Sequence, residues 1–525
     1  MHSATAPSFR RNTHYSSGVT SQASRALWVG ALTAAAALLY CLDALLAYRR
    51  FLTSTFDLVI FDQGVRAYAH FHAPVSIARG VADGEGAHFS LLADHWSPIL
   101  ALLAPLYWIH DSPATLLAAQ GVLFALAIPP LWIYTRRRLA SQAAAYLVCG
   151  AYALSMPIMA AVVFDFHEVA FVPVLTVIMV ERFDAGKKWH GVLAAAVLLL
   201  VKEDMGLLVA GFGGYLLLTR RRWTGLAFLA GGVLATWIAT HVLIPAFGGS
   251  ASFYWAYGQF GSSPGSALLA MAEHPLHAVH VFFSPWVKTQ TMLGLLVALG
   301  FLPLASPMTV AVLPLLAERM LASGYPLWWQ NKFQYDAFVV MMLVCAAVDG
   351  AARLEGWLDR SRWEAVIRFR GAAWRIGALW AAAVCAGALL TFPSSPFGEL
   401  LHPKFYQLNP RIRAAAAAIA RVPSGTEVEA VNNVGSRLSA RDTVLLLDGT
   451  PRWAPWVVAD TIGLDFPFCS PSQQGQLVSY LQRNGYTRVF SDDGYVVLHR
   501  PADQRTTQAL AHPVPATRLH TNVCY

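Results

Sequence analysis

Acidic and histidine side chains occur in short groups along this chain, each next to long apolar runs. Clustered carboxylates can supply a general base or oxygen ligands for a hard metal ion, and a nearby lysine can bind a phosphate. Charged groups beside apolar runs are costly to keep, so they are candidates for a functional site. The candidates are Asp57, Asp62 and His95, then Asp165, His167 and Glu168, and finally Lys202, Glu203 and Asp204.

Each group also has a purely structural interpretation. Asp57 follows Ser54 and Thr55 and could act only by favouring a helix N-terminus. The group around His167 could be a solvated turn, and Lys202 could simply neutralise its two acidic neighbours. Asp57 and Asp62 are five positions apart, about 140° around an α-helix, so we expect only one of them to be central.

The composition indicates what surrounds these groups. Hydrophobic residues make up 56% of the 525-residue chain and charged residues 13%, against about 25% in soluble domains. No water-soluble core could bury this excess, so lipid must surround most of the chain. The net charge of +8 reflects arginine clusters between apolar runs, which is typical of cytoplasmic loops, and we expect no nucleic-acid partner.

We predict a polytopic α-helical membrane protein of the bacterial plasma membrane with about eleven spans. The spans are expected at 26–48, 113–135, 139–160, 169–183, 188–202, 205–219, 223–247, 289–305, 307–322, 336–352 and 374–393. The basic clusters at 136–138, 187–188, 220–222 and 353–375 fall on one side if the N-terminus is cytoplasmic. Residues 1–25 then form a cytoplasmic tail, 26–393 the membrane domain, and 394–525 a domain on the outer side.

Three expected spans, at 169–183, 188–202 and 205–219, are too short to cross alone. Short helices are tolerated around a water-filled cavity, so we expect a cavity open to the outer face with Lys202, Glu203 and Asp204 on its wall. The outer loops are 49–112 and 248–288. The apolar run 97–109 in the first loop is expected to form an interfacial or re-entrant helix.

The sequence pattern changes after residue 393, where the long apolar runs end. Helical and strand-like segments alternate at 410–421, 427–431, 443–447, 456–459 and 471–484, and Ser491-Asp492-Asp493-Gly494 separates a strand pair that reads as a hairpin. This pattern predicts a small α/β domain without a Gly-rich phosphate motif. Cys469 and Cys524 both lie in it, so an outer location would permit a disulfide between them, although two unpaired thiols remain the alternative.

Several motifs resemble the membrane-protein family catalogued as domain of unknown function 2079. The similarity covers about residues 50–500. The motifs are Phe56-Asp57-Leu58-Val59-Ile60-Phe61-Asp62-Gln63, His95-Trp96-Ser97-Pro98-Ile99-Leu100, Ala104-Pro105-Leu106-Tyr107, Asp165-Phe166-His167-Glu168, Lys202-Glu203-Asp204, Val431-Asn432-Asn433 and 456–460. The layout is similar to that of the C-type glycosyltransferases, which include protein mannosyltransferases and aminoarabinose transferases.

The resemblance implies a membrane glycosyltransferase that uses a polyprenyl-phosphate sugar donor to modify a cell-envelope acceptor. By position, Asp57 matches the first-loop acid of the superfamily and Asp62 is the second choice for the base. Lys202 is expected to bind the donor phosphate, with His95 and His167 as further contributors. Asp57 is followed by Leu58, so the Asp-Glu pair common in the mannosyltransferase branch is absent. A divalent metal ion is compatible with these carboxylates, but no ligand set is predicted.

Two other functions remain open from the residues. A transporter or flippase of a lipid-linked or small polar substrate should show repeated halves with matching broken helices, and none is found in the sequence. A non-catalytic envelope scaffold or sensor would read a ligand through the outer domain and would not need the charged triplet Lys202, Glu203 and Asp204.

Overall fold

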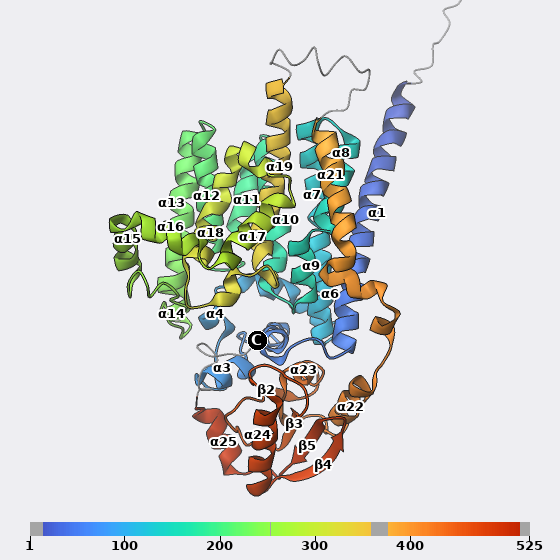
Figure 1. The fold of residues 1–525 in the computed structure, drawn as a ribbon, viewed down its shortest axis with the longest axis vertical. Helices are drawn as coiled ribbons and strands as arrows, with labels where there is room; N and C mark the ends of the chain where they lie inside the picture. The colour runs from blue at the N-terminus through green and yellow to red at the C-terminus, as the bar shows by residue number, and fades with distance from the viewer. Residues whose placement is uncertain (1–13, 253, 359–375, 515–525) are drawn as a thin grey trace, which may run out of the picture.

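The computed structural model describes residues 14–252, 254–358 and 376–514. Figure 1 shows a bundle of long and short helices and, beneath it, a small α/β domain formed by the last part of the chain. The segment with α3 (Ile77–Asp83) and α4 (Leu91–Asp94) lies between these two parts.

Within the described residues, six helical stretches are long and apolar enough to cross a membrane. They contain α1 (His14–Arg49), α6 (Pro113–Ala125) with α7 (Ile128–Leu139), α8 (Gln142–Ala153) with α9 (Met156–Val163), α13 (Arg222–Ile238) with η4 (Ala239–Leu243) and α14 (Ile244–Ala246), η8 (Gln334–Asp336) with α19 (Ala337–Leu358), and α21 (Ile376–Thr391). The chain is therefore a multi-pass membrane protein.

The expected number of about eleven spans is not confirmed. The other five expected segments are helical but short: α10 (Val172–Asp184), α11 (Lys188–Leu198), α12 (Met205–Leu218), α17 (Trp286–Val297) and α18 (Leu313–Leu321). Gly186 and Gly300 take positive φ angles of 75° and 61° soon after α10 and α17. This left-handed conformation ends a helix, so both helices stop before they reach span length.

Glycines bring α12 and α13 unusually close together. A Cβ at Gly206 would lie 2.3 Å from the carbonyl oxygen of Gly232, and one at Gly213 would lie 2.4 Å from the amide nitrogen of Leu229. Small residues allow such close packing between helices in lipid. The contact fixes the start of α12, which directly follows Lys202, Glu203 and Asp204.

The first long loop folds into short elements. They are η1 (Thr55–Val59), a π-helix, then α2 (Ile60–Ala69), α3, α4, η2 (Pro98–Leu103) and α5 (Ala104–Tyr107). The expected short apolar helix in 97–109 is confirmed as Pro98–Tyr107, which is below span length.

The second long loop carries α15 (Pro264–Glu273) and α16 (Pro275–Phe283). The remaining 3₁₀ turns are η3 (Glu168–Phe171), η5 (Leu302–Ala305), η6 (Pro307–Val312), η7 (Pro326–Trp329), η9 (Phe392–Ser394), η10 (Pro396–Leu401) and η11 (Pro403–Tyr406).

The C-terminal domain contains a five-stranded sheet with strand order β2-β1-β3-β5-β4. Its elements are α22 (Pro410–Ile419), β1 (Glu427–Ala430), α23 (Asn432–Gly435), β2 (Thr443–Leu446), β3 (Trp456–Asp460), α24 (Pro471–Arg483), β4 (Thr487–Asp492), β5 (Tyr495–His499) and α25 (Gln504–Ala511). β1 is parallel to β2 and β3, whereas β5 is antiparallel to β3 and β4. The expected hairpin is present, and Asp493 and Gly494 take the positive φ angles that a tight hairpin turn favours.

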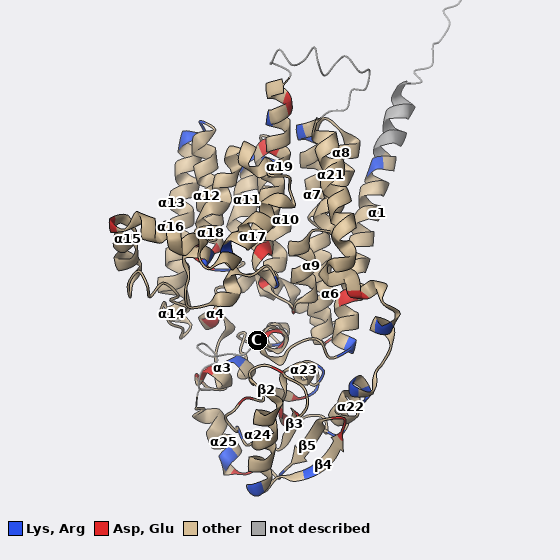
Figure 2. Cartoon of the chain, viewed as in Figure 1, with Lys and Arg blue, Asp and Glu red and all other residues tan. Residues whose placement is uncertain are grey.

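Basic residues gather at the end of the bundle that lies away from the C-terminal domain, as the blue segments at the upper ends of α13 and α19 in Figure 2 show. Some are paired in the bundle: Arg137 lies 2.5 Å from Glu181, and Arg138 and Arg353 both pair with Asp349. The predicted direction of insertion depends on this one-sided distribution, and it stays a prediction.

Only one of the two cysteines of the predicted disulfide lies among the described residues. Cys469 is disulfide-bonded. Cys524, its expected partner, lies outside the described residues.

Candidate functional site

A cavity of about 1310 Å³ brings most of the candidate residues together. Its wall is built by the first long loop, the segments that precede η3 and α12, the second long loop, α18 and two residues of the C-terminal domain. Of the predicted site residues, those that line it are Asp57, His95, His167, Glu168, Lys202, Glu203 and Asp204. The expectation that Lys202, Glu203 and Asp204 share a cavity wall is therefore confirmed.

Asp57 lies in the first turn of η1. Ser54 caps this turn, with its hydroxyl accepting a hydrogen bond from the Asp57 amide at 3.0 Å. The Asp57 carboxylate remains 28% exposed and lies 3.6 Å from Nε2 of His167. Asp57 is therefore both part of a helix start and a carboxylate facing the cavity.

His167 is held in one orientation. Its Nδ1 lies 3.1 Å from the Asp165 carbonyl oxygen, which can only accept, so Nδ1 carries a proton. Burial alone would lower the pKa of this imidazole, but the hydrogen bond to Asp57 and the charges of Asp57 and Glu168 outweigh it and raise the pKa. His167 is thus suited to hold the Asp57 carboxylate in place.

Asp165 supports the site from outside the cavity. Its Oδ2 accepts a hydrogen bond from the Ser54 amide at 2.9 Å. Burial, together with the negative charge of Asp57, raises the pKa of the Asp165 carboxyl to about 7. The buried side chain of Gln120, which the sequence did not single out, accepts from the His167 amide at 3.0 Å. A glutamine inside an apolar span is the signal that could have found it.

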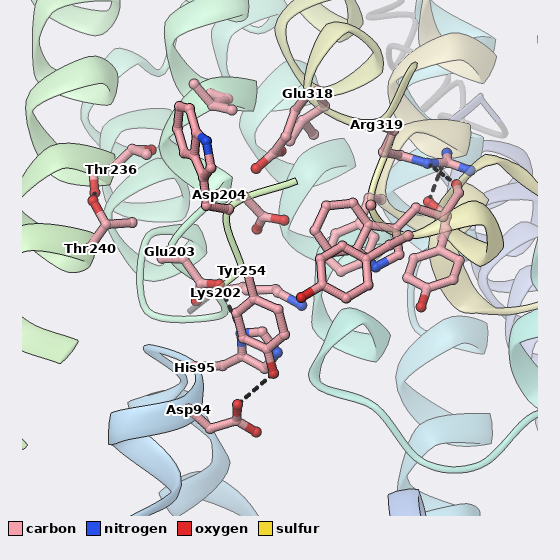
Figure 3. Close-up of a pocket in the computed structure, with 18 of the residues that line it drawn as sticks. Asp94, His95, Lys202, Glu203, Asp204, Thr236, Thr240, Tyr254, Glu318 and Arg319 are labelled. Carbon is pink, nitrogen blue, oxygen red and sulfur yellow. Dashed lines mark hydrogen bonds and ion pairs between the residues drawn. The ribbon is translucent and has the colours of Figure 1, made fainter. Parts of the chain in front are cut away.

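The three charged residues between α11 and α12 have different partners. Nζ of Lys202 lies 3.3 Å from Oε1 of Glu168. The Glu203 carboxylate lies 2.8 Å from Nδ1 of His95 and accepts from the Trp96 amide at 3.0 Å, which attaches the first loop to this turn. Asp204 lines the cavity beside them, with Glu318 also in view in Figure 3.

Sequence reasoning missed a clamp between the two long loops. The buried guanidinium of Arg79 donates to both oxygens of Asp94 at 2.9 and 3.0 Å, and the Tyr254 hydroxyl donates to Asp94 at 2.5 Å. Although burial would raise it, these partners lower the pKa of the Asp94 carboxyl. Tyr254 also stacks on His95 with ring centroids 4.8 Å apart (Figure 3). Arg79 and Asp94 are oppositely charged residues of the same outer loop, and this was the available signal.

Asp62 lies away from the cavity. Its fully buried carboxylate lies 2.6 Å from Nη1 of Arg66, accepts from the Tyr107 hydroxyl at 2.7 Å and accepts from the Ser439 hydroxyl. These contacts join the first loop to the C-terminal domain. As expected from their spacing, Asp57 and Asp62 do not face the same space.

No metal centre is visible in the part of the chain that the structure describes: no group of three or more His, Cys, Asp or Glu side chains there could hold a metal ion.

Comparisons with known proteins fit this architecture. A family model described as "Predicted membrane protein (DUF2079)" matches residues 47–497. No curated protein matches the chain. The apo crystal structure of ArnT from Cupriavidus metallidurans aligns with a TM-score of 0.51 and 12% identity, covering 91% of this chain and 100% of that one.

A second solved structure is the archaeal oligosaccharyltransferase AglB from Archaeoglobus fulgidus, in complex with an inhibitory peptide and a dolichol-phosphate. It aligns with a TM-score of 0.37 and 12% identity, covering 92% of this chain and 77% of that one. The likeness to ArnT shows a shared fold, and at this identity it shows no activity.

Proposed function

The chain belongs to the DUF2079 family of predicted membrane proteins, and we propose that it is a glycosyltransferase that moves a sugar from a polyprenyl-phosphate carrier to a cell-envelope acceptor. The observation that carries the proposal is the meeting of Asp57, His167 and Lys202 in one cavity of a C-type glycosyltransferase fold. The sequence separates Asp57 from His167 and Lys202 by more than a hundred positions, and the fold brings them together.

The reaction assigns a task to each of them. The acceptor hydroxyl oxygen forms a bond to C1 of the sugar as the bond between C1 and the phosphate oxygen breaks. The hydroxyl proton passes to the Asp57 carboxylate, which His167 holds in place. The polyprenyl phosphate leaves with the bonding electrons, and its negative charge develops where Lys202 can stabilise it.

The cavity also suits a donor with a lipid tail. Part of its wall is apolar and comes from a helix of span length and from the second long loop: Val233, Trp237, Leu268 and Met271. A lipid chain can stay in the bilayer beside this wall while its phosphate reaches the charged part of the cavity. The partners we propose are therefore membrane lipid, a polyprenyl-phosphate sugar and a cell-envelope acceptor.

Asp57→Asn is the decisive variant. It keeps the size of the side chain and removes the proton affinity, so we expect transfer from a labelled polyprenyl-phosphate sugar to fall about 10²–10⁴-fold. Glu85→Gln is the matched control, because Glu85 is an exposed acid of the same loop that does not line the cavity. It should transfer at the wild-type rate.

Three outcomes would contradict the proposal in different ways. Near-normal transfer by folded Asp57→Asn protein would overturn Asp57 as the base. Flux of the lipid-linked substrate across the membrane without any transfer product would indicate a transporter. A wild-type protein with neither product nor flux, and with ligand binding unaffected by Asp57→Asn, would indicate a scaffold or sensor.

A further inference from the structure

The C-terminal domain reaches the start of the helix that carries Asp57. Oδ1 of Asn432, the first residue of α23, accepts hydrogen bonds from the amides of Thr55 at 3.0 Å and Phe56 at 2.9 Å. These are the first two residues of η1, and amides at a helix start have no partner within the helix. Asn432 therefore supplies the partners that η1 itself cannot.

The other side of the Asn432 amide is also engaged. Its side chain also interacts with the Asp465 carboxyl and counteracts part of the rise in pKa that burial causes there. The Asp465 carboxylate additionally accepts from the Asn433 amide at 2.8 Å and from the Phe466 amide at 2.9 Å. One carboxylate thus fixes both C-terminal-domain residues that line the cavity, Asn432 and Phe466. Asparagine suits this position because its amide can accept on one side and donate on the other.

Further contacts make the junction close. The Thr55 hydroxyl donates to the Asn432 carbonyl oxygen at 2.8 Å, and the Gly435 amide lies 3.1 Å from the same hydroxyl. A Cβ at Gly435 would lie 2.2 Å from this oxygen, so only glycine allows the approach. The Phe56 ring packs against Phe466 with centroids 5.2 Å apart.

We propose that Asn432 is a positioning residue that sets the place of the Asp57 carboxylate from the C-terminal domain, an inference that rests on the proposed function. Asp57 is the next residue after the two amides that Asn432 binds, and its carboxylate lies 3.6 Å from His167. A displacement of about 1 Å at a reacting group can cost about 10²-fold in rate. Without Asn432, the start of η1 loses its anchor, and Asp57 moves relative to His167.

Hydrogen exchange in the full-length protein tests the positioning without any substrate. Asn432→Ala should increase amide exchange in a peptide covering 52–62 by about tenfold, which corresponds to about 1.4 kcal/mol. Asn433→Ala is the control, because the Asn433 side chain donates its hydrogen bond to the Tyr495 hydroxyl at 2.9 Å and not to η1. It should leave exchange in 52–62 unchanged.

Exchanging the carboxylate and the amide between positions 432 and 465 provides a rescue experiment for the contact with η1. Asn432→Asp keeps oxygens for the two η1 amides but faces Asp465 with a second carboxylate, so it should also expose 52–62. Combining it with Asp465→Asn removes the repulsion between the two carboxylates and supplies a donor to the carboxylate at position 432, but it loses one of the two amide hydrogen bonds that Asp465 accepts, so it should recover part of the protection. If Asn432→Ala protein does not accumulate, this pair decides alone, because exposure without recovery overturns the proposal.

A displacement of Asp57 can be detected as a change in the chemical reactivity of His167. Reaction of His167 with diethyl pyrocarbonate, followed by peptide mapping over a pH series, reports how strongly Asp57 keeps the imidazole protonated. Asn432→Ala should shift this pH profile to lower values, and Asn433→Ala should not. Unchanged exchange in 52–62 together with an unchanged His167 profile would refute the positioning role.

Turnover links the inference to the proposed function. With a polyprenyl-phosphate sugar, Asn432→Ala should lower kcat by about 10–100-fold with little change in KM, since it alters geometry and not donor binding. Wild-type protein without transfer would refute the proposed function, while exchange and the His167 profile would still decide the positioning. Transfer by wild type and by Asn432→Ala at equal kcat would refute the positioning alone.

Discussion

At the residue scale, Lys202 shows how one charge can serve both folding and function. Its Nζ lies 3.3 Å from the Glu168 carboxylate, whose side chain is only 2% exposed. Removal of Lys202 alone would leave that carboxylate buried without its partner, which is strongly destabilising. A test of the proposed phosphate contact must therefore neutralise both residues together.

We expect Lys202→Ala combined with Glu168→Gln to fold and to bind the donor poorly. A hydrogen bond to a charged group is worth about 1.5–3 kcal/mol, so affinity for undecaprenyl phosphate should fall by about 10–100-fold. Titration of the purified protein with this lipid measures the change, with Glu168→Gln alone as the control. Equal affinity in the double variant and the control would contradict a phosphate contact at Lys202.

Asp62 should behave differently from Asp57. Asp62→Asn weakens the contacts to Arg66, Tyr107 and Ser439 but leaves Arg66 its second partner, Asp111, at 2.7 Å. We expect a loss of about 1–3 kcal/mol in stability, measured by thermal unfolding, and near-normal turnover per folded molecule. A fully folded Asp62→Asn protein that has lost transfer would reverse the assignment of the base.

The candidate residues of the cavity were largely predictable because charge in an apolar chain is a strong signal. The chain's own spacing also showed that Asp57 and Asp62 would not act together. Asn432 could not be assigned a role in the same way: an asparagine in a polar domain is unremarkable, and its importance depends on a contact with Thr55 that only the folded chain creates.

At the element scale, β1 contains a carboxyl group whose ionisation opposes folding. Oε1 of Glu429 accepts from the amides of Arg452 and Ala454, both at 3.0 Å. Burial nevertheless raises the pKa of this carboxyl from 4.5 to about 7. Between these two values the folded domain holds more protons than the unfolded chain, so its stability falls as the pH rises and the loss is complete above the folded-state pKa.

We therefore expect the C-terminal domain of the full-length protein to be about 1–3 kcal/mol more stable near pH 5 than near pH 8. Glu429→Gln keeps the accepting oxygen, so it should show a smaller dependence than wild type and exceed wild type near pH 8, and the remaining dependence comes from Asp448 and Asp465, whose pKa burial raises to about 6. Asp492→Asn, on an exposed part of β4, should keep the wild-type dependence. Pulse proteolysis in urea at the two pH values measures all three proteins, and an undiminished dependence in Glu429→Gln would contradict the explanation.

Elements of the C-terminal domain were predicted closely, because strand alternation and the Asp493-Gly494 turn are local signals. The number of spans was not predicted closely. Apolar runs alone do not show that Gly186 and Gly300 end two helices early, nor that the first loop starts with a π-helix whose amides are satisfied by a distant side chain.

At the scale of the whole molecule, we expect the basic ends of the bundle to face the cytoplasm and the C-terminal domain to lie outside. Arginine-rich loops resist export, and these residues gather at the end opposite that domain (Figure 2). A reporter that works only outside should be active when fused after Phe392 and inactive when fused after Leu139, beside the basic end of α7. The reverse pattern would overturn the orientation and, with it, the proposed use of a donor on the outer face.

The junction between Asn432 and η1 also sets an order for biogenesis. The hydrogen bonds from Thr55 and Phe56 join residues 377 and 376 positions apart. At a translation rate of about 5–20 residues per second, roughly 20–75 s separate the synthesis of the two partners. During this interval the amides of Thr55 and Phe56 lack their acceptor, and a nascent chain that ends before Asn432 cannot complete this junction however well its helices insert. The C-terminal domain thus anchors η1 only after the preceding membrane helices have been made.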